Sequence, residues 1–414
     1  MSKPTGTKPL GPVPPGFGVL NGELAICGRC ASELVEAAGR TPLFVYSRDR
    51  LDARMAQLRA VLPERIGVNY AIKANPHPDV IGHMEPLVDG FDIASSGELT
   101  LAQDAGIDPA RVSFAGPGKR DDELEAAIAA GVTLNCESEG EAQRSLAIGK
   151  RLGKAPRIAI RVNPDFELKG SGMKMGGGAR QFGVDAVRVP ALAQSIIAAG
   201  AVWRGLHIFT GSQTLSADAI IEAQGNVLKL AADLAQQIGV PVPKLNMGGG
   251  FGIPYFPNDT ALDLTSVGEA LTAMAADLPP ELSATELCLE LGRYLVGEAG
   301  VYLTRIVDRK ESHGTTYLIT DGGLHHQLAA SGNFGTVVRR NYPVAIASRF
   351  GAQADDVVNV VGCLCTPLDR LADQALMPRA DVGDLVAVFC AGAYGATASP
   401  SGFLGHGPAA EMLV

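Results

Sequence analysis

The sequence predicts an α/β protein in which a (β/α)8 barrel (a TIM barrel) is followed by a C-terminal antiparallel β domain. From about residue 40, short runs of Val, Ile, Leu and Phe alternate with Ala-rich stretches of helical character. After residue 295 Val, Thr, Tyr and Gly dominate and helical periodicity is weak. Alternating strands and helices imply parallel strands with crossover helices, whereas successive short strands imply an antiparallel sheet. A length of 414 residues also suits two domains better than one.

The barrel is predicted from eight candidate strands that occupy roughly 225 residues, a span typical of this fold. These strands are Gly67–Ile72, Gly90–Ala94, Arg111–Ala115, Val132–Cys136, Arg157–Val162, Trp203–Phe209, Lys244–Met247 and Glu286–Glu290, with a further one at Thr41–Ser47. The helical segments are Asp49–Leu62, Gly97–Ala105, Asp121–Ala130, Glu139–Leu152, Val187–Ala199 and Ala217–Ile238. An open, doubly wound sheet is the alternative, but no nucleotide fingerprint follows the first strand.

The β domain is predicted from apolar runs at Val301–Asp308, Thr315–Ile319, Val357–Val361 and Leu385–Phe389. We therefore divide the chain into a barrel over residues 40–290 and a β domain over residues 291–414. Residues 1–39 are expected to form an N-terminal arm and a segment that returns to the β domain.

Composition excludes several classes of protein. A net charge of −9 argues against a nucleic-acid partner, because neutralising phosphates requires an excess of basic residues. No run approaches the roughly 18 apolar residues of a membrane span, and the Pro- and Gly-rich N-terminus is no signal peptide. We expect a cytoplasmic protein whose seven cysteines are free thiols. Cys27 and Cys30 form a lone CxxC that lacks the second pair of a zinc site.

Polar residues that could carry chemistry follow the predicted barrel strands, and reactive groups of such barrels lie at the C-terminal ends of strands. Lys73 follows an apolar run between alanines, which suits either a salt bridge or a Schiff base to a carbonyl. Asp92, His207 and Glu290 occupy the ends of three other strands, and Arg293 follows the last. Three glycines, Gly248–Gly250, could cradle an anion with their backbone N–H groups. Together these groups suit a phosphorylated aldehyde cofactor.

The same motifs resemble those of the fold-type III decarboxylases that depend on pyridoxal 5'-phosphate (PLP), the group of diaminopimelate, ornithine and arginine decarboxylases. The resemblance spans roughly residues 40–400 and rests on Tyr70–Asn75, Phe91–Ser95, Gly211–Gln213, Gly248–Gly250, Glu290–Arg293, Cys365 and Gly392–Gly395. Three further motifs are similar to the subgroup that includes a decarboxylase of carrier-protein-bound glutamate and exosortase-associated decarboxylases: Gln181–Gly183, Cys365–Pro367 and Phe403–His406.

The resemblance implies an alanine-racemase-like barrel and a role for each matching residue. Lys73 forms the Schiff base with PLP, His207 stacks on the cofactor ring and Glu290 pairs with the ring nitrogen. Asp92 and Arg161 support the lysine and the cofactor oxygen, and the phosphate is bound by Ser212, Gly249, Gly250, Arg293 and Tyr394. Cys365 reaches across a homodimer interface into the partner's site and protonates the product carbanion. The reaction implied is loss of carbon dioxide from an α-amino acid through a quinonoid intermediate, which makes the chain a carboxy-lyase.

Two departures from the family's motifs bear on the substrate. Thr366 stands where diaminopimelate-specific relatives carry a glutamate, and the loop after His207 has two extra residues, Phe209 and Thr210. Both departures argue against diaminopimelate and leave either a free amino acid or one bound to a carrier protein. Candidate substrate-binding residues are Arg339, Arg340, Tyr342 and Asp369.

Two other functions fit parts of the pattern: an amino-acid racemase of the same fold, and a non-catalytic PLP-binding protein. Glu290 and Cys365 argue against the racemase, because racemases of this fold usually place an arginine against the ring nitrogen. The β domain argues against the second alternative. No metal is expected, because His325 and His326 lack further ligands in the sequence.

Overall fold

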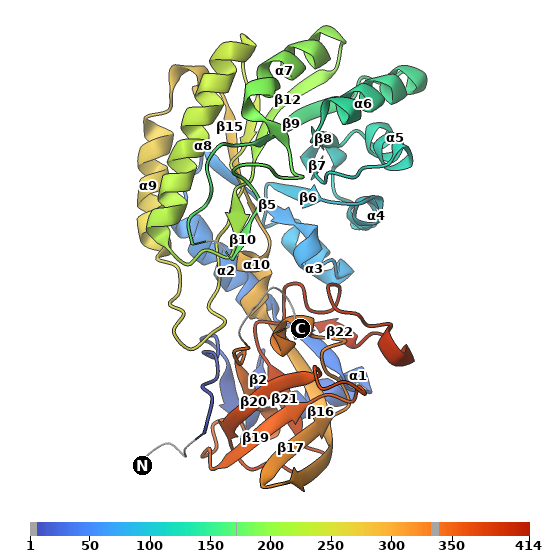
Figure 1. Ribbon diagram of the computed structural model, residues 1–414, viewed down its shortest axis with the longest axis vertical. Coiled ribbons are helices and arrows are strands. Elements are labelled where there is room, and N and C mark those ends of the chain that lie inside the picture. Colours follow the sequence, from blue (N-terminus) through green and yellow to red (C-terminus); the bar gives the residue numbers. More distant parts are fainter. Residues whose placement is uncertain (1–5, 171, 333–338) are drawn as a thin grey trace. The chain divides into compact units, whose positions relative to one another are not determined.

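The computed structural model describes residues 6–170, 172–332 and 339–414 (Figure 1). The chain forms two compact units. The barrel unit comprises Met55–Ile253 and Ala261–Tyr294, and the β unit comprises Met1–Arg54, Pro254–Thr260 and Leu295–Val414. None of the helices in these residues combines the length and apolar character needed to cross a membrane.

The barrel unit is a closed sheet of eight parallel strands surrounded by helices, which confirms the predicted (β/α)8 barrel (Figure 1). The strands follow one another around the barrel in chain order, and β8 pairs with β9 as well as with β7. They are β5 (Ile66–Ala71), β6 (Gly90–Ile93), β7 (Val112–Phe114), β8 (Thr133–Cys136), β9 (Arg157–Asn163), β12 (Val202–Ile208), β14 (Lys244–Asn246) and β15 (Glu286–Leu291). Closure pairs the backbone groups of every strand on both sides, so this sheet has no free edge.

The six predicted helices are present as α2 (Arg48–Val61), α4 (Ser96–Asp104), α5 (Asp121–Ala130), α6 (Glu139–Leu152), α7 (Val189–Ala198) and α8 (Ala217–Ile238). Side-chain caps define several N-termini: the hydroxyls of Ser95 and Ser138 accept hydrogen bonds from the backbone of Glu98 and Glu141, at 3.2 and 3.1 Å. Two barrel helices, α3 (Pro78–Met84) and α9 (Leu264–Ala276), were not predicted.

The β unit contains a mixed sheet rather than the purely antiparallel one expected. The predicted strands are present as β16 (Gly300–Ser312), β17 (Thr315–Thr320), β19 (Asp356–Val361) and β21 (Leu385–Val388). The additional strands are β4 (Leu43–Tyr46), β18 (Val344–Ile346), β20 (Arg370–Met377) and β22 (Ala410–Leu413). Most pairs are antiparallel, but β17 pairs with β19 and β22 pairs with β4 in parallel.

The boundary between the units differs from the predicted one at residue 40. Strand β4 lies inside the range assigned to the barrel but pairs with β16 and β22 of the β unit. Its side chains Leu43 and Val45 are fully buried with Val301, Leu303 and Phe389. The N-terminal segment also joins this unit through β1 (Gly18–Leu20), β2 (Glu23–Ile26), β3 (Arg29–Cys30) and α1 (Ala31–Ala38). Cys27 and Cys30 are free thiols.

Candidate active site

Four of the predicted residues come together in the barrel unit. Lys73 lies in the turn Ile72–Ala74 that follows β5, while Asp92, His207 and Glu290 lie near the C-terminal ends of β6, β12 and β15. Parallel strands of a closed barrel end on the same face, which is where TIM barrels carry their active sites. The spacing of these residues relative to the strands was therefore sufficient to predict their convergence.

Glu290 is the centre of this group. One carboxylate oxygen, Oε1, accepts a hydrogen bond of 3.1 Å from Nζ of Lys73, and the other, Oε2, lies 3.0 Å from Nε2 of His207. Glu290 is 5% exposed, and burial alone raises the pKa of a carboxyl group. The charge of Lys73 and the contact with His207 outweigh that effect and hold the pKa of Glu290 well below its ordinary value. Glu290 is therefore a carboxylate near neutral pH.

Asp92 behaves differently from Glu290, although both carboxyl groups are buried. Burial and the nearby negative charge of Glu290 raise the pKa of Asp92 to about 7, against the hydrogen bond from the Ser113 hydroxyl. The second oxygen, Oδ2, has no hydrogen-bond partner among the described residues. Asp92 can therefore donate or accept a proton near neutral pH, which suits a group that faces a polar ligand.

Arg161 is positioned by a residue that the sequence analysis missed. Nη1 of Arg161 donates a hydrogen bond of 2.9 Å to Oε1 of Glu137, and both side chains are almost fully buried. Glu137 also accepts hydrogen bonds from the backbone of Gly116 and Gly183, at 2.6 and 3.0 Å. These interactions orient the guanidinium of Arg161. Glu137 directly follows β8, the same strand-end signal that identified Lys73.

The glycine loop after β14 packs backbone against backbone with its neighbours. A Cβ atom on Gly249 would lie 2.2 Å from the carbonyl oxygen of Glu290, and one on Gly250 would lie 2.9 Å from that of Gly211. Gly250 also has a φ of +86°, and its carbonyl accepts a hydrogen bond of 2.9 Å from the backbone of Thr214. The loop therefore lies beside Gly211–Ser212, and only glycine fits it. Such a loop, with Ser212 beside it and Arg293 just beyond β15, is suited to a phosphate group.

His207 and Phe209 are two aromatic rings near the end of β12 that differ in burial. The His207 ring is 1% exposed, and burial lowers its pKa, against the opposing effect of Glu290, so that the ring is neutral near pH 7. Phe209 lies two residues further along the chain, beyond the end of β12, and is only partly buried. The two ring centroids are 6.5 Å apart at an interplanar angle of 68°. Phe209 is thus the more accessible of the two rings, a point that the sequence analysis treated only as a loop insertion.

The remaining predicted residues belong to the β unit. Cys365 is exposed on the loop between β19 and β20, and Tyr394 follows β21. Nη2 of Arg339 donates a hydrogen bond of 2.5 Å to the carbonyl of Arg370. Arg340 stacks on Phe256, with 3.6 Å between its guanidinium carbon and the ring centroid, and Tyr342 is buried against Tyr255.

Asp369 has a geometry that favours a structural role over substrate binding. Its side chain is 2% exposed and accepts hydrogen bonds from the backbone of Leu324 and Leu364, at 2.7 and 2.9 Å. These bonds tie the Cys365 loop to the segment after β17. Since both carboxylate oxygens are used in this way, Asp369 organises the loop.

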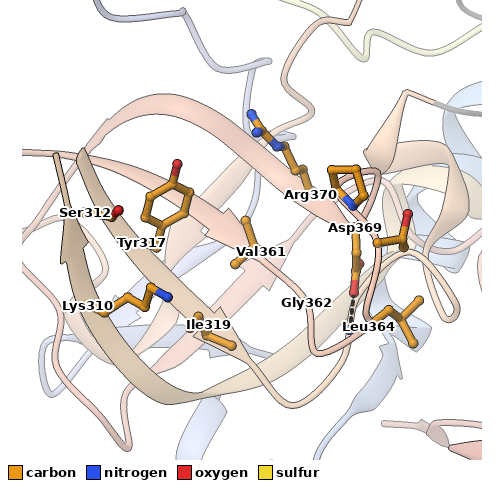
Figure 2. A pocket seen from close by; sticks show the side chains of 11 residues that line it. Lys310, Ser312, Tyr317, Ile319, Val361, Gly362, Leu364, Asp369 and Arg370 are labelled. Atoms are coloured by element: carbon orange, nitrogen blue, oxygen red, sulfur yellow. Dashed lines mark hydrogen bonds between the residues drawn. The ribbon is translucent and has the colours of Figure 1, made fainter. Parts of the chain in front are cut away.

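A hollow of about 350 Å³ lies beside the same loop in the β unit (Figure 2). In Figure 2, Lys310 and Tyr317 lie on one side of the hollow and Arg370 lies towards the other. Thr366 and Pro367 also line it. Two cations and a tyrosine hydroxyl make this hollow suited to an anionic group. It was not predicted, because its residues come from four separate strands and a loop.

The chain was compared with known proteins. Residues 48–297 match the family described as "Pyridoxal-dependent decarboxylase, pyridoxal binding domain". An L-glutamyl-[BtrI acyl-carrier protein] decarboxylase of Niallia circulans is 35% identical over 379 residues, which cover 90% of this chain and 88% of the relative. A diaminopimelate decarboxylase of Archaeoglobus fulgidus is 34% identical over 404 residues, covering 96% and 93%.

Among solved structures, a variant of the Helicobacter pylori diaminopimelate decarboxylase complexed with L-lysine superimposes with a TM-score of 0.80. It is 26% identical in sequence, and the match covers 92% of this chain and 94% of that one. The family match contains Lys73, Asp92, Arg161, His207 and Glu290, and the whole-length matches extend to the β unit that carries Cys365. The chain therefore belongs to the PLP-dependent decarboxylases of the family that includes diaminopimelate decarboxylases.

Proposed function

We propose that the chain removes the α-carboxylate of an amino acid at the C-terminal end of its barrel. The observation that carries this proposal is the continuous contact of Lys73, Glu290 and His207 inside the range that matches the PLP-binding family. When bound there, PLP supplies an electron sink for the electron pair left behind as carbon dioxide departs.

Residues of the chain bind the cofactor and transfer the proton. Lys73 would hold the cofactor, because its amine is the group that can bond to an aldehyde. Glu290, held ionised by its surroundings, would pair with the ring nitrogen and favour its protonated form. Asp92 and Arg161 support the lysine and the cofactor oxygen, and the phosphate is bound by Ser212, Gly249, Gly250, Arg293 and Tyr394. Cys365 delivers a proton to the α-carbon of the product.

Phe209, rather than His207, is proposed to contact the cofactor ring. His207 is almost fully buried and contacts Glu290, whereas Phe209 is the more exposed aromatic ring beyond the same strand. We expect Phe209→Ala to weaken PLP binding roughly tenfold, because stacking on an aromatic ring is worth about 0.5–1.5 kcal/mol. Phe209→Tyr is the matched control and should bind PLP as the native protein does.

A variant of His207 shows which of the two rings contacts the cofactor. His207→Asn should leave the PLP dissociation constant nearly unchanged but reduce turnover, because the residue orients Glu290. Fluorescence titration of the cofactor-free protein with PLP measures both constants. A large loss of PLP affinity in His207→Asn, with none in Phe209→Ala, would restore the stacking role to His207.

The substrate is proposed to be a specialised amino acid, either free or attached to a carrier protein. Support comes from Thr366, which replaces a glutamate expected for diaminopimelate, and from the relative that acts on a carrier-protein-bound glutamate. The cationic hollow beside Thr366 is suited to an anionic part of such a substrate. A homodimer is proposed as the functional form, because Cys365 is exposed on a loop of the β unit.

The proposed function is tested by two measurements on the purified protein loaded with PLP. Borohydride reduction followed by proteolysis and mass spectrometry should find the pyridoxyl group on the peptide that contains Lys73. Release of carbon dioxide should then be assayed with carboxyl-labelled amino acids, free and carrier-bound, including glutamate and diaminopimelate. Racemisation without release of carbon dioxide would refute decarboxylation and favour the racemase.

A further inference from the structure

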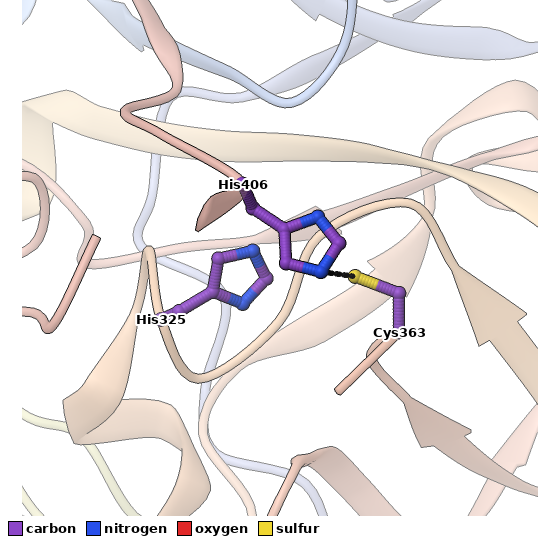
Figure 3. Close-up of side chains that lie close together, drawn as sticks. All are labelled: His325, Cys363 and His406. Carbon is purple, nitrogen blue, oxygen red and sulfur yellow. Dashed lines mark hydrogen bonds between the residues drawn. The ribbon is translucent and has the colours of Figure 1, made fainter. Parts of the chain in front are cut away.

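Three potential metal ligands meet in the β unit, far along the chain from one another. His325 follows β17, Cys363 follows β19, and His406 precedes β22 (Figure 3). Since β17 and β19 are parallel neighbours, the segments that follow them lie at the same end of the sheet. The sequence offered no further ligand near His325, so this cluster is a product of the fold.

The geometry of the cluster approaches that of a coordination sphere. One ligand atom from each of the three residues lies within 4.8 Å of the others, and Sγ of Cys363 is 3.9 Å from Nε2 of His406. Nitrogen and sulfur ligands of a tetrahedral zinc ion, bound at about 2.1 and 2.3 Å, lie roughly 3.5 Å apart. The ligand atoms must therefore approach one another by at most about 1.3 Å to bind the ion, and the exposed side chain of His406 can move by that amount.

His325 is the residue that most needs a ligand. Its side chain is fully buried, and neither ring nitrogen has a hydrogen-bond partner among the described residues. Buried polar groups are nearly always satisfied, so such a histidine requires an explanation. Its neighbour His326 is satisfied, since its ring nitrogens lie 3.2 Å from the Tyr302 hydroxyl and 3.0 Å from the carbonyl oxygen of Gly407. Figure 3 shows the His325 ring turned towards His406 and Cys363.

We propose that His325, Cys363 and His406 bind a zinc ion. Two imidazoles and one thiolate form a ligand set that suits zinc and does not suit calcium or magnesium, which take oxygen ligands. On binding, the Cys363 thiol gives its proton to solvent, and the two imidazoles bind through neutral nitrogen atoms. Three protein ligands leave a fourth position for water or for a group of a bound partner.

The proposed zinc site lies next to the loop that carries Cys365. Cys363 lies two residues before Cys365, on the loop that Asp369 ties down through Leu364. A zinc ion would fix the same loop to the segments around His325 and His406, and so hold Cys365 in one conformation. The ion would act as a clamp and take no part in the chemistry at PLP.

The test measures metal content and is independent of catalysis. The full-length, PLP-loaded protein is incubated with zinc chloride, passed through a desalting column and analysed by elemental mass spectrometry. We expect about one zinc ion per chain in the native protein. The content should fall at least about tenfold in Cys363→Ser and in His406→Ala, because each loses a direct ligand.

Matched controls keep the result specific. Cys365→Ser removes an exposed cysteine two residues away, and His313→Ala removes an exposed histidine of the same unit, so both should retain zinc. Because His406 is exposed, its replacement should not disturb folding, and circular dichroism with PLP content verifies this. Zinc should also protect one thiol from a thiol reagent in the native protein and none in Cys363→Ser. A native protein that holds no zinc, or a His406→Ala variant that holds as much as the native one, would refute the site.

Discussion

Replacing Lys73 with alanine is expected to reduce turnover at least about 10³-fold, because the variant lacks the amine that binds the cofactor and exchanges with the substrate. The loss should not come from unfolding. Lys73 is 41% exposed and its ion pair with Glu290 spans 3.1 Å, so the variant removes a partly solvated charge rather than a core contact. Carbon dioxide release, measured at saturating substrate and PLP, checks the prediction.

Two further variants show that the amine, not the charge, is responsible. Lys73→Arg keeps a cation near Glu290 but provides no amine that can form a Schiff base, and it should be as inactive as Lys73→Ala. Lys150→Ala removes a lysine from the exposed end of α6 and should have native activity. If Lys73→Arg retained substantial activity, the lysine would act only as a counter-ion to Glu290, and the proposed chemistry would be wrong.

A dimer with shared sites predicts that two inactive variants restore each other. Lys73→Ala and Cys365→Ala each disable both sites of a homodimer. In a mixed dimer, one site combines the intact Lys73 of one subunit with the intact Cys365 of the other. The purified mixed dimer should therefore have about half of the native activity, since an isologous dimer contains two equivalent sites.

Co-expression with two affinity tags yields the mixed dimer, and each variant carrying both tags serves as the control. Light scattering verifies that each preparation is dimeric. A dimeric preparation that shows no recovery would mean that Lys73 and Cys365 act within one chain or that Cys365 is dispensable. Residual activity in the Cys365→Ala homodimer would mean that Cys365 is dispensable. An inactive Cys365→Ala homodimer would mean that Lys73 and Cys365 act within one chain.

The barrel could be predicted from the sequence because its signals are local. Each strand is a short apolar run that is buried in the structure, and helices such as α4 and α6 begin at serine caps that are visible in the sequence. The missed helix α3 is only seven residues long, so it shows too few turns for a periodic pattern to be recognised.

The candidate site was predictable to the extent that it follows strand ends. Lys73, Asp92, His207 and Glu290 converge in the barrel because parallel strands deliver their C-terminal residues to one face. The difference in exposure between the His207 and Phe209 rings was not predictable, because it depends on how the surrounding segments pack. Nor was the contrast between the pKa values of Glu290 and Asp92, which move in opposite directions. Lys73 and His207 outweigh the effect of burial at Glu290, whereas the negative charge of Glu290 adds to the effect of burial at Asp92.

The sequence by itself thus determined the barrel, the cofactor and the residues at the strand ends, since each of these is encoded by neighbouring residues and by a fixed order of motifs. Only the tertiary structure decided that β4 belongs to the β unit, that Asp369 holds a loop, and that His325, Cys363 and His406 meet. These features join segments that are distant in the chain. Their contacts depend on strand pairing and burial across the whole unit, which no local pattern of residues specifies.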